Sequence, residues 1–388
     1  MKDRSPFTPG NPVPVELFVG RRNEISEIQK HVKQSTNGKQ ESVFLSGERG
    51  IGKSSFAKFL CGMACKEKLL PIHIFLGEVT SLDEMARRTF EQILISSESQ
   101  TWYTKISGYF RDKIQQIDVF GVAISFRPSE SDLRELVQHF PEALYNITEK
   151  IKPEKKGLFI VLDDIDMISK TPEFANWFKS LVDGIATRYS NYPICIMLIG
   201  LPEFRDNLSR NQPSLMRIFR VVDIEKLEQD EVIDFFTRAF EKVDIRVEDD
   251  AMKTMVRYSS GLPTIMHEIG DAVYWRNDDD IITQDDVLDG VMTAAENIGK
   301  KYLDPTVYRA VRSEKYKSIL GKLGSVFEGE FKKKDIEDQL DPDEKKVFDN
   351  FLRKMRDLKV IMIDKDGERG SYRFANEIYP VYFFMKSG

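Results

Sequence analysis

The chain has 388 residues, of which 41% are hydrophobic and 31% are charged, and its formal net charge is −6. This length exceeds one compact core and predicts two or three domains, while the negative charge argues against nucleic-acid binding over the whole surface. No apolar run approaches the roughly 20 residues of a membrane span, and the first residues lack the apolar segment of a secretion signal. We therefore expect a cytoplasmic protein without membrane contact.

The three cysteines indicate no disulfide framework. Cys61 and Cys65 lie one helical turn apart, and Cys195 lies in an apolar run. A pair at this spacing can hold a metal in principle, but no His or Cys lies nearby at a suitable spacing. We expect the cysteines to be buried small apolar residues in a reducing compartment.

Short apolar runs alternate with helical stretches after a proline-rich N-terminal arm, residues 1–17. The strand signals lie at residues 42–46, 70–75, 158–162, 194–199 and 220–224. Strands that alternate with helices predict a parallel sheet covered on both faces. The segment 98–156 interrupts the alternation with a β-rich piece at 117–126 and an amphipathic helix around 133–151. We interpret this segment as an insertion.

The remaining sequence predicts a helical region at 228–300 and a winged helix at 301–388. In the first region the strand pattern disappears, and helices are expected at 232–243, 249–258, 264–274 and 285–298. In the second, helices are expected at 314–323, 332–339 and 343–358, followed by β segments at 360–364 and 371–374. Asp341, Pro342 and Glu344 form the start signal of the third helix.

Residues 47–54, GERGIGKS, match every fixed position of the phosphate-binding motif G-x4-G-K-[ST]. The match follows a buried strand and opens a helix, so backbone N–H groups and the helix N-terminus can surround phosphate oxygens. We expect Lys53 to reach the β- and γ-phosphates of ATP and the Ser54 hydroxyl to hold Mg²⁺. The residues expected to surround the phosphates are Gly47, Glu48, Arg49, Gly50, Ile51, Gly52, Lys53, Ser54 and Ser55.

A second acidic element follows the apolar run LFIVL, where the sequence continues DDID. A P-loop requires such carboxylates for its metal. We expect Asp163 to hold Mg²⁺ through water, and Asp164 to orient or deprotonate the attacking water. Asp166 is expected to be a capping or supporting group. These elements predict an α/β P-loop NTPase domain of the ASCE type at 18–227, with helical lid and winged-helix domain after it.

FVGRRNEI at residues 18–25, GERGIGKSS, VLDDID and GLP at residues 261–263 together resemble the motif series of STAND and AAA+ ATPases. The LDD and GLP elements are similar to the STAND branch that includes NB-ARC proteins. The FVGR box and winged helix resemble archaeal-type AAA+ ATPases and, more distantly, replication initiators. The resemblance implies that Phe18, Val19 and Gly20 flank the adenine and that Pro263 starts a lid helix facing it.

Two departures from that family pattern favour a slow switch over a fast motor. The strand before Gly200 ends in Gly-Leu-Pro, where a polar residue that senses the γ-phosphate is usual, and Thr264 stands where AAA+ lids usually carry an arginine. An arginine from a neighbouring subunit would complete such a site. Arg217 and Arg220 lie in the segment where these arginines occur, and an ordinary salt bridge is the alternative for each.

The sequence thus predicts an ATP-binding, slowly hydrolysing STAND/AAA+-like switch that uses ATP and Mg²⁺. The expected output is self-assembly into a homo-oligomer or control of an effector protein, and the resemblance suggests a defence or conflict system. The first alternative is an initiator- or loader-type ATPase that binds duplex DNA through the winged helix. The second, a P-loop small-molecule kinase, is disfavoured because its lid would need phosphate-binding arginines.

Overall fold

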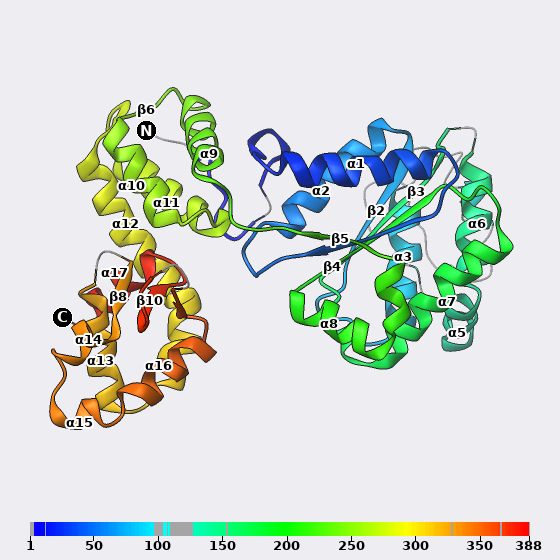
Figure 1. Cartoon of the computed structure of the whole chain (residues 1–388). Coiled ribbons are helices and arrows are strands. Elements are labelled where there is room, and N and C mark those ends of the chain that lie inside the picture. Colours follow the sequence, from blue (N-terminus) through cyan, green and yellow to red (C-terminus); the bar gives the residue numbers. More distant parts are fainter. Residues whose placement is uncertain are drawn as a thin grey trace. The chain divides into compact units, whose positions relative to one another are not determined.

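The computed structural model describes residues 4–11, 13–96, 104–106, 108, 126, 128–152, 154–326, 329–364 and 367–387. Contacts divide the chain into two compact units. Residues 21–225 form the first, which we call the sheet unit, and residues 1–20 with 226–388 form the second, the C-terminal unit (Figure 1). The N-terminal arm therefore belongs to the same unit as the helical lid and the predicted winged helix.

The sheet unit is built on a five-stranded parallel sheet with the strand order β2-β3-β4-β1-β5. Its strands are β1 (Glu41–Ser46), β2 (Leu69–Phe75), β3 (Gly157–Asp163), β4 (Ile194–Gly200) and β5 (Arg220–Asp223). The central strands β1, β3 and β4 are buried along their whole length, as expected where helices cover both faces. The predicted parallel sheet is confirmed. Because β4 lies between β1 and β3, the order is that of the ASCE type.

Helices cover this sheet. They are α1 (Arg22–Thr36), α2 (Lys53–Lys66), α3 (Leu82–Ile95), α5 (Glu130–Gln138), α6 (Phe140–Ile151), α7 (Pro172–Arg188) and α8 (Pro202–Asn211), with 3-10 turns η3 (Ile168–Lys170) and η4 (Pro213–Arg217). The single helix predicted around 133–151 is wrong, because the chain breaks at His139 between α5 and α6. Pro141 has no N–H and fits only in the first turn of a helix. The β-rich piece predicted at 117–126 lies outside the described residues except for Phe126.

The cysteines are only partly as predicted. All are free, and Cys195 is buried in β4, but Cys61 is half-buried and Cys65 is exposed on α2. Among the described residues, no group of three or more His, Cys, Asp or Glu side chains is arranged to hold a metal ion. Of the helices described, none combines the length and apolar character that crossing a membrane requires.

The helical lid consists of the predicted helices with two short strands among them. Its helices are α9 (Gln229–Glu241), α10 (Asp249–Ser259), α11 (Pro263–Arg276) and α12 (Gln284–Ile298), and the π-helical segment η5 (Gly299–Tyr308) continues α12. The expectation that this region lacks strands is wrong, because β6 (Arg246–Val247) pairs in parallel with β7 (Ile281–Ile282). Two-residue strands are too short to produce a visible alternation of polar and apolar residues.

The C-terminal region has the element order of a winged helix. It contains α13 (Glu314–Gly324), β8 (Glu330–Lys332), α14 (Lys333–Glu337), α15 (Pro342–Lys345), α16 (Phe348–Asp357), β9 (Ile361–Ile363), β10 (Ser371–Phe374) and α17 (Ile378–Ser387). The strands form an antiparallel sheet with the order β8-β10-β9. The winged helix remains a prediction, and that prediction omitted β8 and α17.

Two of the predicted helices in this region are shorter or broken. The second begins at Lys333 because Lys332 pairs with Ser371 in the sheet. The third breaks at Val347 into α15 and α16. Asp341 and Glu344 complete the predicted capping box, and Lys322 Nζ donates to Glu344 Oε2 at 2.5 Å, so α15 is fixed independently of α16.

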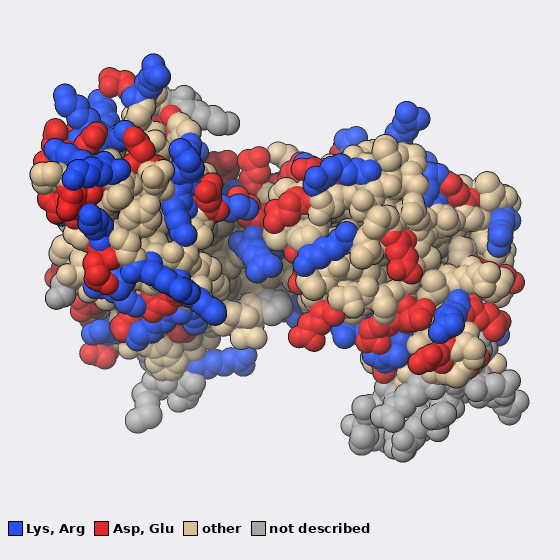
Figure 2. Space-filling view, turned by 90° about the horizontal axis from the view of Figure 1, so that it is seen from below, with Lys and Arg blue, Asp and Glu red and all other residues tan. Residues whose placement is uncertain are grey.

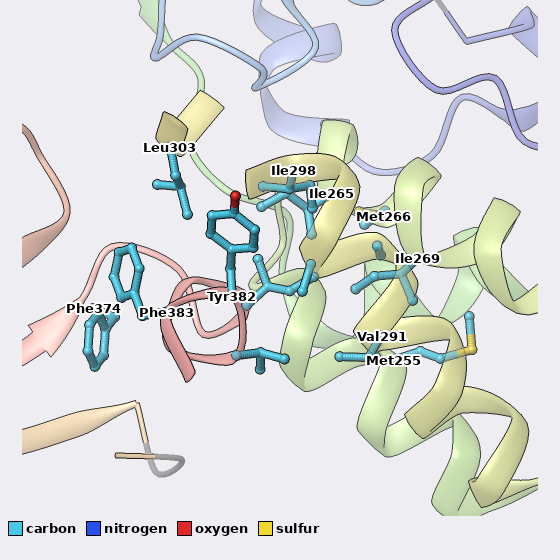
Figure 3. Packing of buried hydrophobic residues seen from close by; sticks show 14 of the residues in the cluster. Met255, Ile265, Met266, Ile269, Val291, Ile298, Leu303, Phe374, Tyr382 and Phe383 are labelled. Atoms are coloured by element: carbon cyan, nitrogen blue, oxygen red, sulfur yellow. The ribbon is translucent and has the colours of Figure 1, made fainter. Parts of the chain in front are cut away.

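One hydrophobic core runs from the lid into the winged helix, so these two predicted regions share a single body. Figure 3 shows lid residues such as Ile265 and Ile298 and C-terminal residues such as Tyr382 and Phe383 in one continuous cluster. Gly299 makes this packing possible, because a Cβ there would lie 2.3 Å from the Tyr382 ring. The lid helices and the C-terminal region are therefore packed as one compact unit.

The N-terminal arm, which contains the 3-10 turn η1 (Val15–Leu17), is anchored to the lid by Phe7. Phe7 is 4% exposed and its ring packs edge-on against Phe240, at a centroid distance of 5.0 Å. Gly270 leaves the space for it, since a Cβ there would lie 2.3 Å from the Phe7 ring. Next to Phe7, the Thr8 amide donates to Nδ1 of buried His267 at 3.1 Å. His267 must be neutral at Nδ1 to accept this bond.

Protonation of His267 should therefore destabilise the C-terminal unit in mild acid. Burial lowers the pKa of His267 to about 4, below the unfolded value of about 6.5, so the unfolded chain binds a proton that the folded chain does not. Stability is kept above pH 6.5 and falls as the pH drops towards 4, by up to about 3 kcal/mol. Thermal melts from pH 7.5 to 4.5 should show a steeper loss for the wild type than for His267→Gln. His139→Gln, at an exposed histidine, is the control and should follow the wild type.

Candidate functional site

The P-loop connects the carboxyl end of β1 to the N-terminus of α2. Gly50 and Gly52 adopt positive φ angles of 78° and 90°, which glycine accepts without steric strain. A Cβ on Gly47 would lie 2.7 Å from Ile224 Cγ1, so this position also requires glycine. Glu48, Arg49 and Gly50 are exposed, while Ile51 is buried. The loop therefore has the shape that its spacing predicts, with the first amides of α2 lacking helical acceptors.

Lys53 is held inside the loop. Its Nζ donates to the carbonyl oxygens of Gly47 at 2.8 Å and Glu48 at 2.9 Å. Burial lowers the pKa of Lys53, and the nearby carboxylates, led by Asp166, oppose that shift. The ammonium thus lies within the field of the acidic cluster that follows β3. A phosphate would offer Lys53 stronger, charge-assisted partners than the two carbonyl groups.

The strand β3 ends at Asp163, and in the sheet only β4 separates it from β1, the strand that leads into the P-loop. Because β1, β3 and β4 are parallel, their carboxyl ends meet at one edge. Asp163 is 1% exposed, and its Oδ2 lies 2.9 Å from Nε2 of His73 on β2. The strand pairing that sets Phe75 opposite Asp163 brings His73 to this position.

The donors at this edge are chemically suited to Mg²⁺. The ion prefers hard oxygen ligands and commonly uses one or two carboxylates together with substrate phosphates and water. Asp163 supplies a carboxylate, and Ser54 Oγ is half-buried without a hydrogen-bond partner among the described residues. Ser54 and Asp163 fit the ion in this structure, and their assignment as its ligands remains a prediction.

Asp164 and Asp166 occupy different environments. Asp164 is exposed and adopts a left-handed conformation with φ 59°, and its Oδ2 would lie 2.7 Å from a Cβ on Gly77. Asp166 is buried, and its Oδ1 accepts a hydrogen bond from the Leu201 amide at 3.1 Å. Burial raises the pKa of Asp166. Asp166 thus links the acidic loop to the end of β4, where the sequence lacks a polar sensor residue.

The two arginines that precede β5 differ in their surroundings. Arg220 Nε lies 2.5 Å from Glu27 Oε1 of α1, in a salt bridge within the unit. Arg217 ends η4, is exposed, and makes no ion pair with the residues that the structure describes. The salt-bridge alternative therefore applies to Arg220. The role of Arg217 as the arginine offered to a neighbouring subunit remains a prediction.

The residues expected at the adenine belong to the C-terminal unit. Val19 is buried in the hydrophobic core of that unit, and Phe18 is half-buried. Pro263 is the first residue of α11, as the GLP motif predicts. Gly261 of this motif has φ 68°, and a Cβ there would lie 2.3 Å from the Leu227 carbonyl oxygen. The adenine contacts of Phe18, Val19 and Pro263 remain predictions.

Two polar residues of the sheet unit were not assigned a role from the sequence. Arg21 is 6% exposed, and its guanidinium donates to the carbonyl oxygens of Glu225 and of Ile51 in the P-loop. His73 contacts Asp163 as described above. The FVGR box contains Arg21 and could have indicated a role for it. His73 belongs to no recognisable motif, so no signal in the sequence indicated its role.

Comparison with known proteins agrees with this geometry. Residues 17–185 match the family model of the AAA ATPase domain. The chain is 22% identical over 265 residues to an uncharacterized HTH-type transcriptional regulator of Methanocaldococcus jannaschii. That alignment covers 64% of this chain and 61% of the relative. The chain therefore spans less than two thirds of the relative's length.

Solved structures with the same fold include archaeal ATPases. A Walker-type ATPase of Pyrococcus abyssi superposes with a TM-score of 0.54 at 15% identity, covering 94% of this chain and 96% of that one. The ORC2 protein of Aeropyrum pernix, in ADPNP-ADP complexes, gives a TM-score of 0.57 at 12% identity, covering 98% and 96%. These likenesses support the fold of both units. The match to the AAA ATPase domain model at residues 17–185, together with the P-loop geometry, indicates an ATP-hydrolysing P-loop domain in this chain.

Proposed function

We propose that this ATPase is a nucleotide-controlled switch: MgATP at the P-loop sets the position of the C-terminal unit, and slow hydrolysis resets it. The observation that carries the proposal is the single hydrophobic core that joins lid and winged helix. A unit built in this way responds to a lid contact as one body. The γ-phosphate is the group that distinguishes ATP from ADP, so it biases the two states.

Each side chain at the sheet edge has a defined task in this proposal. Lys53 leaves the carbonyls of Gly47 and Glu48 to bind the β- and γ-phosphates. Bound Mg²⁺ would neutralise phosphate charge, with Ser54 and Asp163 as the residues that hold it. Asp164, exposed beside Gly77, orients or deprotonates the attacking water. Asp166 keeps the acidic loop attached to β4 through the Leu201 amide.

Replacing Lys53 by alanine should abolish tight ATP binding in a folded protein. Charge-assisted hydrogen bonds contribute about 1.5–3 kcal/mol each, so losing two to phosphate should weaken binding about 100-fold or more. Isothermal titration calorimetry measures the affinity, and circular dichroism verifies the fold. Lys58→Ala, at an exposed lysine of the same helix, is the matched control. Unchanged affinity in folded Lys53→Ala would remove the basis of the proposed site.

Replacing Asp164 by asparagine should preserve MgATP binding and suppress turnover. Asp163 still serves the metal, whereas a positioned base contributes about 10²–10⁴-fold to the rate. Single-turnover hydrolysis and nucleotide titration separate these two effects. Asp206→Asn, at an exposed position of α8, should hydrolyse ATP at the wild-type rate. A fully active Asp164→Asn would transfer the role to Asp166.

The proposed output is assembly with further copies or with an effector protein, in which Arg217 completes the site of a neighbour. The exposure of Arg217 and its lack of an ion pair among the described residues support this assignment. The STAND branch is the finer family assignment that the LDD and GLP motifs suggest, and a defence or conflict role follows only from that resemblance. Light scattering after size exclusion, with ADP or a non-hydrolysable ATP analogue, tests the assembly.

Duplex DNA is the second candidate partner, because the relative in Methanocaldococcus jannaschii is described as an HTH-type regulator. The charges of the winged helix give mixed support. Lys332 and Lys333, beside each other at the start of α14, form ion pairs with Glu368 at 2.9 Å and Asp349 at 2.6 Å. Figure 2 shows Lys and Arg side chains interspersed with Asp and Glu on the visible face of this unit. The turn that connects β9 to β10 lies partly outside the described residues, at 365–366.

Any DNA affinity should therefore depend on α16 rather than on Lys332 and Lys333. Arg353 and Arg356 are exposed on α16 and form no ion pairs within the described part of the chain. We expect weak binding by the ATP-loaded protein that Arg353→Glu with Arg356→Glu removes, while Lys253→Glu on the lid leaves it unchanged. Fluorescence anisotropy between about 50 and 200 mM salt is the measurement. A loss of DNA affinity of about 10³-fold over that range is the behaviour of six or more phosphate contacts. It would favour the DNA-bound ATPase over the switch that acts on a protein partner.

A further inference from the structure

The two compact units are connected by the chain at two places, the Gly20–Arg21 and Glu225–Lys226 peptide bonds. At the first crossing, both residues have left-handed backbones, with φ 69° at Gly20 and φ 60° at Arg21. A non-glycine residue adopts this conformation only when its surroundings compensate for the strain. Arg21 is therefore held in an unfavourable backbone conformation at a connection between two bodies.

On the sheet side, Arg21 joins three segments that are distant in sequence. Its guanidinium donates to the Ile51 carbonyl of the P-loop at 3.2 Å and to the Glu225 carbonyl at the second crossing. Ile51 is 3% exposed and Arg21 is 6% exposed, so these bonds lie in a dry environment where they are strong. Arginine suits this position because its planar fork can bond two acceptors at once, which a lysine does less well.

On the other side, the residues after the second crossing are bound to both parts of the C-terminal unit. Lys226 Nζ donates to the Ala375 carbonyl, just before α17, at 2.9 Å. The Leu227 amide donates to the Gly261 carbonyl of the GLP turn, also at 2.9 Å. Consecutive residues thus contact the winged helix and the lid.

The loop before α17 is tied to the lid as well. The Glu377 amide donates to Ser260 Oγ at 3.2 Å, and Arg257 Nε lies 2.6 Å from Glu377 Oε2. A displacement at Lys226 and Leu227 would therefore reach the winged helix and the lid together. None of these contacts requires a nucleotide to touch the lid.

We propose that Arg21 is a coupling residue, which transmits the state of the P-loop to the crossing at Glu225–Lys226 and from there to the winged helix. Phosphate binding draws Lys53 away from Gly47 and Glu48 and so changes the loop that carries Ile51. The guanidinium passes that change to Glu225, and Lys226 carries it to Ala375. This role deepens the proposed switch and rests on it, since it supplies the route between nucleotide and output.

Hydrogen–deuterium exchange of the full chain, with ADP or a non-hydrolysable ATP analogue, tests the route. In the wild type, the two nucleotides should produce different exchange at 224–228 and 375–378. Arg21→Ala should bind both nucleotides within about threefold of wild-type affinity and still protect the P-loop at 47–54. In Arg21→Ala, the difference in exchange at 375–378 between the two nucleotides should fall about fivefold or more. A factor of about five is the lower end of ordinary coupling between sites.

Two further variants locate the path. Lys226→Met should keep the nucleotide-dependent difference in exchange at the P-loop and lose it at 375–378, because the hydrogen bond from Lys226 Nζ to the Ala375 carbonyl is removed. Arg22→Ala, at the exposed neighbour of Arg21, is the control and should match the wild type. If Arg21→Ala does not fold, Arg21→Lys keeps the charge, cannot bridge both carbonyls in the same way, and decides the question.

The outcomes separate the coupling role from the proposed function. If the wild type shows no nucleotide-dependent difference at 375–378, the switch itself is wrong. If the wild type shows it and folded Arg21→Ala or Arg21→Lys retains it, only the role of Arg21 is overturned. A loss of nucleotide affinity greater than about tenfold in Arg21→Ala would make Arg21 a binding residue and also overturn the coupling role.

Discussion

The chemistry of this protein depends on how the Lys53 ammonium is accommodated before a phosphate arrives. Burial disfavours its charge and lowers its pKa, and two P-loop carbonyls together with the carboxylates after β3 offset part of that cost. Carbonyl groups are neutral acceptors, so a phosphate replaces them with stronger partners. The glycines at 47, 50 and 52 allow the backbone to curl around this ammonium, and the parallel sheet brings the acids to the same edge.

The parts of the site that follow from local sequence were predictable. The P-loop spacing defines its own backbone, and the apolar run before Asp163 marks a buried strand whichever fold contains it. Arg21 and His73 were not predictable, because their partners are set by tertiary structure. Arg21 donates to the Glu225 carbonyl, which is 204 residues away in the sequence. His73 contacts Asp163 because β2 pairs with β3. No local pattern records such contacts.

The fold shows the same division. The central strands β3 and β4 were predicted because a continuous apolar run is a strong signal, whereas the helix breaks at His139 and Val347 were missed. Apolar periodicity continues across both breaks, so the pattern alone predicts one helix in each case. Competing local interactions decide otherwise: Pro141 must lie in a first turn, and Glu344 is fixed by its capping box and by Lys322.

The winged helix illustrates why a fold with a known DNA-binding geometry does not define a DNA-binding surface. A recognition helix usually contacts base edges with its N-terminal residues. Here the segment before α16 is used structurally, since Asp341 and Glu344 cap α15 and Lys346 pairs with Asp343. Arg353 and Arg356, two exposed basic residues for which the described chain shows no ion pair, lie towards the other end of α16. Such a surface can attract phosphates but is poorly placed to read bases, so its charge pattern favours a protein partner or backbone contacts over sequence recognition.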